Sequence, residues 1–187
     1  MRRATLGLLI VAFGAGCQAK PTPAPKTQAK SISPPPAPEP TEAGKAFRLA
    51  EEPGGGKSVL DIRQDAKDGD EIVVVGRIGG SRKPFTGRAA FTIVDASIKP
   101  CSENGDDACP TPWDYCCGVG KEELAKATML IKLVGDDGQT RPDDARTLLG
   151  LTELQTVVVR GKAKRDEAGN VTVLLNGIYV RPGKGSS

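Results

Sequence analysis

The chain has 187 residues, with 26 lysines and arginines, 23 aspartates and glutamates, a net charge of +3 and no histidine. Without histidine it lacks the commonest general base and the usual partner of serine and cysteine nucleophiles. We therefore expect a protein that is not an enzyme and that has neither catalytic residues nor a cofactor. Basic and acidic residues are equal in number from residue 57 onward. A neutral domain argues against nucleic-acid binding, because that affinity depends on neutralising phosphates.

The first seventeen residues have the pattern of a secretory signal. Two arginines precede an apolar run at 4–13, which is followed by three small residues and Cys17. About ten apolar residues are too few to span a bilayer, so we expect the segment to be removed.

Residues 13–17 resemble the lipobox of bacterial lipoproteins. The resemblance implies that 1–16 are a lipoprotein signal peptide and that Cys17 is lipidated. The protein would then be anchored to a membrane of the cell envelope, on its periplasmic or extracellular side. Soluble secretion after cleavage nearby and a cytoplasmic protein with a chance apolar start are the alternatives.

Residues 17–56 follow as a proline-rich segment. Nine prolines occur in it, mostly among alanine, lysine, glutamate, serine and threonine. Such a composition provides too little apolar surface to offset the entropy of ordering the chain. We expect a disordered tether, with a docking site for a proline-reading module as the alternative.

Residues 57–187 have the size of one domain. Apolar, β-branched runs predict five strands, at 71–78, 90–95, 128–134, 156–164 and 171–180. In the last strand the inward parity changes between Leu175 and Ile178, which predicts a bulge or bend at Asn176-Gly177. A proline near the start and a glycine at the end predict a short helix at 140–150.

Three strands, a helix and two strands, with a glycine in the first strand, resemble the OB fold over residues 70–181. The resemblance implies a mainly β domain, a small five-stranded barrel with one short helix. OB folds typically bind oligonucleotides or oligosaccharides on one face, although a fold alone does not transfer such a function. Another small barrel or sandwich and a mixed α+β domain are the alternatives.

An insertion at 96–126 carries four cysteines: Cys101, Cys109, Cys116 and Cys117. A long loop in a compact domain needs a cross-link, and thiols outside the cytoplasm are oxidised, so we expect disulfides. A bond between the two adjacent cysteines is disfavoured by disulfide geometry. Cys101 and Cys109 are therefore each expected to bond one member of the adjacent pair.

Two alternatives use the same cysteines. One is a thiolate site for zinc or another soft metal, although the cysteine spacings differ from those usual for zinc. The other is a redox dithiol, although no Cys-x-x-Cys is present. Acidic side chains that could assist a metal are Glu103, Asp106, Asp107 and Asp114.

Aromatic and basic residues beside the insertion are the candidate binding residues. Trp113 and Tyr115 could stack on a sugar or grip a partner, or Trp113 could simply cap the open end of the core. Arg82, Lys83 and Phe85 lie in the loop between the first two strands, where OB-like barrels often contact ligands; a solvated basic loop is the alternative.

The sequence thus favours a membrane-tethered, noncatalytic binding or structural module. Its partners would be the membrane, through the lipid anchor, and an envelope protein, peptide or glycan. Metal binding or thiol redox by the insertion is the alternative function.

Overall fold

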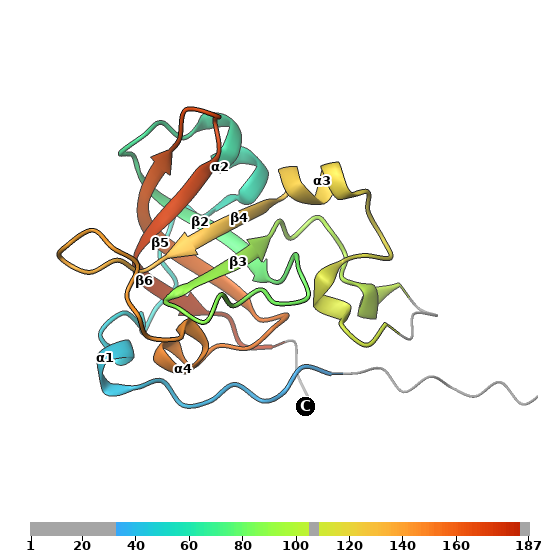
Figure 1. Cartoon of the computed structure of the whole chain (residues 1–187), viewed down its shortest axis with the longest axis horizontal. Coiled ribbons are helices and arrows are strands. Elements are labelled where there is room, and N and C mark those ends of the chain that lie inside the picture. The colour runs from blue at the N-terminus through green and yellow to red at the C-terminus, as the bar shows by residue number, and fades with distance from the viewer. Residues whose placement is uncertain (1–32, 105–108, 184–187) are drawn as a thin grey trace, which may run out of the picture.

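The computed structural model describes residues 33–104 and 109–183, and its centre is a closed β-barrel (Figure 1). The barrel strands are β2 (Glu71–Ile78), β3 (Ala90–Val94), β4 (Thr128–Lys132), β5 (Thr156–Arg165) and β6 (Val171–Val180). β2 pairs with both β3 and β5, and the parallel pairing of β4 with β6 completes the ring. The short strand β1 (Lys57–Ser58) pairs with β2 outside it. The predicted mainly β, OB-like barrel is confirmed.

The helices are short. They are α1 (Glu42–Lys45), α2 (Val59–Asp65), α3 (Lys121–Lys126) and α4 (Ala145–Leu149). The single predicted helix corresponds to α4, which starts only where the Asp144 carboxylate accepts from two backbone N–H groups and ends at Gly150 in the left-handed region. In the described ranges no helix has the length and apolar character needed to cross a membrane.

Alternating side chains of the strands fill the barrel. In β2 every second residue from Ile72 to Ile78 is buried, as expected for a strand with one face on a core. Side chains with no exposed surface come from all five strands: Val74, Ile93, Ile131, Val159, Val173 and Ile178.

The predicted irregularity in β6 is a bulge. Arg160 pairs with Gly177 and Gly161 pairs with Leu175, so Asn176 is the extra residue. The bulge lets Leu175 and Ile178 both face the core in spite of their opposite parity.

Residues 33–56 pack on the barrel, which corrects the prediction that the disordered tether extends to residue 56. Leu49 N–H donates to the Ile178 carbonyl at 2.8 Å, and Ile178 N–H donates to the Phe47 carbonyl at 2.8 Å. The amino-acid composition of the segment could not reveal its packing on the barrel, because backbone groups form these hydrogen bonds.

The same segment sits against α4. Thr41 N–H donates to the Leu148 carbonyl at 3.2 Å, and a Cβ added at Gly44 would lie 1.6 Å from that carbonyl oxygen. We call residues 33–56 the strap. The signal peptide, Cys17 and the predicted tether up to residue 32 lie outside the described residues.

Candidate functional site

The insertion between β3 and β4 lies at one end of the barrel and contains two 3-10 turns, η1 (Cys101–Glu103) and η2 (Pro112–Asp114), followed by α3 (Figure 1). Gly80 N–H donates to the Trp113 carbonyl at 2.8 Å. A Cβ at Gly79 would lie 2.6 Å from the same carbonyl oxygen and 2.8 Å from Cε2 of Tyr115. The insertion therefore rests directly on the loop after β2, and only glycine leaves room for it.

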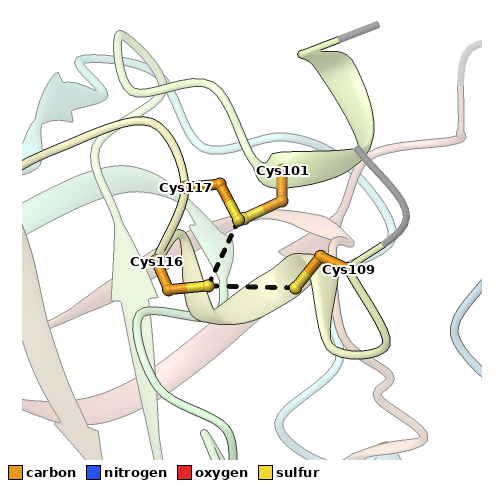
Figure 2. Close-up of side chains that lie close together, drawn as sticks. All are labelled: Cys101, Cys109, Cys116 and Cys117. Carbon is orange, nitrogen blue, oxygen red and sulfur yellow. Dashed lines mark hydrogen bonds between the residues drawn. The ribbon is translucent and has the colours of Figure 1, made fainter. Parts of the chain in front are cut away.

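Figure 2 shows the four cysteine side chains of the insertion gathered in one place. Their Sγ atoms all lie within 4.8 Å of one another. Cys109 and Cys116 are 3.8 Å apart between sulfurs, and Cys116 and Cys117 are 3.3 Å apart. Cys101 is fully buried at the start of η1, whereas the adjacent pair after η2 is exposed.

None of these described sulfur atoms forms a disulfide, for which the bond length would be about 2.05 Å. The predicted disulfides are therefore not seen in the structure. Four ligands at about 2.3 Å from a tetrahedral zinc ion would be separated by roughly 3.8 Å from one another. The Cys109–Cys116 separation of 3.8 Å equals that value, the Cys116–Cys117 separation is 3.3 Å, and all four sulfurs lie within 4.8 Å, so they are near enough to one another to bind a single metal ion.

The Asp114 side chain holds the turn that leads into the adjacent cysteines in place. Its carboxylate, which is 7% exposed, accepts from Cys116 N–H at 3.0 Å and from Thr111 Oγ1 at 2.8 Å. Arg82 Nε lies 3.7 Å from Oδ2. Burial would raise the pKa of Asp114, but the hydrogen bonds from Cys116 and Thr111 lower it overall. The ionised carboxylate therefore fixes the turn that leads into the adjacent thiols.

The thiols differ in their affinity for protons. Burial raises the pKa of Cys101. A hydrogen bond to the Asp114 carboxylate raises the pKa of Cys116 to about 12. Burial would also raise the pKa of Cys109, yet the backbone N–H of Thr111 donates to its sulfur and the pKa is lowered overall. A cation that binds here must displace protons from Cys101 and Cys116.

Three of the predicted binding residues lie together beside the cysteines. The Trp113 indole N–H donates to the Arg82 carbonyl at 3.2 Å, and Trp113 is half-buried. The side chain of Arg82 is 83% exposed, and Lys83 is exposed as well. We call Arg82, Lys83 and Trp113 the basic-aromatic patch.

The side chains of the other two predicted binding residues, Tyr115 and Phe85, pack inside the protein. Tyr115 has no exposed surface, so the expectation that its ring contacts a partner is wrong; its backbone φ of +60° and the space above Gly79 turn the ring inward. Phe85 is half-buried against Phe91, with ring centroids 6.0 Å apart, and the Arg146 guanidinium lies 4.3 Å from its ring centroid.

Two supporting residues were missed by sequence reasoning. Arg77 of β2 donates to Glu103 at 2.6 Å and so ties η1 to the barrel. The role of Gly79 in making room for the insertion could not be predicted, because in the sequence a glycine at this position indicates only a turn. The hydrogen bond from Cys116 N–H to the Asp114 side chain is an Asx turn, which an aspartate two residues before a cysteine could have suggested.

Comparison with protein-family models, curated proteins and solved structures gives no match to this chain.

Proposed function

We propose that this chain is an exported lipoprotein, held at a membrane of the cell envelope through Cys17, whose barrel carries a four-thiolate site for zinc or another soft metal ion. The observation that carries the metal assignment is the convergence of four Sγ atoms within 4.8 Å without a disulfide. Sulfur ligands select soft or borderline ions over calcium and magnesium.

The surroundings of the sulfurs support the same proposal. Burial opposes ionisation of Cys109, but the Thr111 backbone N–H donates to its sulfur and its pKa is lowered overall; at Cys101 burial outweighs the donor from Cys117, and the pKa stays raised. Such donors stabilise the thiolate form, which is the form that binds metal. Outer hydrogen bonds of this kind also orient metal ligands.

The site would be structural and noncatalytic. When four protein ligands fill a tetrahedral zinc ion, no position remains for a water or substrate. The bound ion would instead hold the insertion together beside the basic-aromatic patch. In this proposal the patch, with Trp113 at its centre, contacts an envelope protein, peptide or glycan.

Metal analysis and thiol counting test the metal site. The chain with Cys17→Ser, purified under reducing conditions, is expected to bind one zinc ion and to protect its four remaining thiols from modification. Cys116→Ser should lose the metal, and Ser102→Ala, an exposed neighbour in η1, should retain it. Four oxidised cysteines that take up no metal after reduction would overturn the proposal in favour of disulfides.

The anchor is tested separately. Detergent partition and mass spectrometry of the mature protein should show a diacylated N-terminal Cys17, and Cys17→Ser should move the protein to the aqueous phase. A mature protein that begins at another residue and carries no lipid would refute the anchor without affecting the metal site.

A further inference from the structure

Cys109 and Cys116 lie on either side of the η2 turn, and Figure 2 shows their side chains pointing toward one another. Their sulfurs are 3.8 Å apart, whereas a disulfide needs about 2.05 Å. Rotation about a Cα–Cβ bond moves a sulfur from one staggered position to another, which is enough to close a gap of about 1.8 Å. The two thiols can therefore form a disulfide without rearrangement of the barrel.

Exposure to solvent favours the same pair. Cys101 has no exposed surface, whereas Cys109 is half-buried and the adjacent cysteines are exposed. An oxidant in solution therefore reaches the sulfurs after η1 first. A bond between Cys116 and Cys117 would join adjacent residues, which normal disulfide geometry disfavours. Cys109 and Cys116 are the pair that oxidation should link first.

We propose that the metal site is a redox switch, in which oxidation by a peroxide links Cys109 to Cys116 and releases the metal ion, and reduction restores the site. This inference rests on the proposed function, because an exported protein meets an oxidising environment. The disulfide expected from the sequence and the thiolate site are then two states of the same cysteines.

The reaction balances with hydrogen peroxide as the oxidant. One sulfur of the pair attacks a peroxide oxygen and breaks the O–O bond, which gives a sulfenic acid and a hydroxide. The second sulfur attacks the first, forms the S–S bond and expels a second hydroxide. Two electrons pass from the sulfurs to the peroxide, and two protons from the medium convert the hydroxides to water. Cys101 and Cys117 alone then remain as ligands, which is too few for a tetrahedral zinc site.

The experiment uses the Cys17→Ser chain, loaded with zinc and treated with one equivalent of hydrogen peroxide. A chromophoric chelator should report one zinc ion released per disulfide. Cleavage at Asp107 and Asp114 separates Cys101, Cys109 and the adjacent pair, so mass spectrometry of the fragments identifies the cysteines that are linked. A dithiol reductant should then restore zinc binding. Ser102→Ala, the exposed neighbour in η1, should behave like the parent.

Two variants test the pairing in metal-free, reduced chains. Cys117→Ser keeps the proposed pair, so its disulfide should form at the parental rate, whereas Cys109→Ser should oxidise about 10-fold more slowly or less readily still. Equal rates in Cys109→Ser and the parent, a first disulfide at Cys101, or zinc that stays bound after oxidation would overturn the switch and leave the metal site standing. A reduced parent that binds no zinc would overturn the proposed function, and the switch with it.

Discussion

Oδ1 of Asp114 accepts a hydrogen bond from the backbone N–H of Cys116 at 3.0 Å. This bond fixes the backbone between the η2 turn and the adjacent cysteines. Replacement of Asp114 by alanine should weaken zinc binding about 10- to 100-fold, the usual effect of losing an outer-shell partner. Asp114→Asn should lose less, because its amide oxygen can still accept from Cys116. Competition titration measures both, and Asp143→Ala, an exposed residue far along the sequence, is the control.

Gly79→Ala should displace the insertion from the barrel. The new Cβ would meet the Trp113 carbonyl oxygen at 2.6 Å, and we expect a destabilisation of about 1–3 kcal/mol, as for overpacked sites. Trp113 fluorescence should change while far-UV circular dichroism stays similar. Gly120→Ala lies in the same insertion with no atom within 4 Å of its Cβ, so it should behave like the parent. Unchanged fluorescence in Gly79→Ala would contradict the docking described above.

The barrel was predictable because each of its strands has a recognisable pattern of apolar residues within its own sequence. β2 and β6 alternate or run apolar over eight and ten residues, and the parity change before Ile178 was sufficient to place the bulge. The strap was not predictable, since Leu49 and Thr41 are ordered by backbone hydrogen bonds to distant elements. Helix α2 has only seven residues, too few for a clear helical period.

The candidate site was predictable in its composition but not in its geometry. Sequence spacing placed four cysteines in one insertion, yet it carries no information on the distances between their sulfur atoms. The inward turn of Tyr115 depends on a positive φ and on the missing side chain of Gly79. Neither can be seen in the order of residues around the cysteines.

Glu153 should make the stability of the barrel depend on pH in the acid range. Burial would raise its pKa, but hydrogen bonds and the charge of Arg146 lower it overall from 4.5. A lowered folded-state pKa gives stability that is full above the unfolded value and is lost as the pH falls through the folded value. Chemical denaturation from pH 7 to pH 2 should therefore show a loss below about pH 4.5 that is smaller in Glu153→Gln.

The partner of Glu153 provides a second check on that pair. Arg146 donates from Nη1 to Glu153 at 2.8 Å, and Glu153 is 5% exposed. Arg146→Ala leaves the carboxylate buried without its cationic partner and should cost about 3 kcal/mol at neutral pH. Arg141→Ala, which breaks the exposed pair with Asp143, should cost about 1 kcal/mol or less. Equal effects of the two variants would show that burial of Glu153 contributes nothing.

Gly44→Ala should release the strap. Its Cβ would overlap the Leu148 carbonyl at 1.6 Å, a backbone atom that cannot move aside without shifting α4. Limited proteolysis should then cut within residues 33–56 while the barrel resists, and the Leu49 amide should exchange faster with solvent. Gly54→Ala, with nothing within 4 Å of its Cβ, should keep the parental cleavage pattern.

Removal of zinc by a chelator should loosen the insertion and spare the barrel. The barrel core consists of side chains such as Val74, Ile131 and Val173, which lie outside the insertion and stay buried without a metal. The insertion, in contrast, consists mainly of two 3-10 turns and the six-residue helix α3, which has no buried residue, and none of its described residues belongs to the barrel core. Chelation of the reduced protein should therefore shift Trp113 fluorescence and increase amide exchange around residues 109–120, with little change in far-UV circular dichroism. Cooperative unfolding of the whole chain on chelation would instead show that the four cysteines maintain the barrel itself, and the insertion would no longer be a separable element.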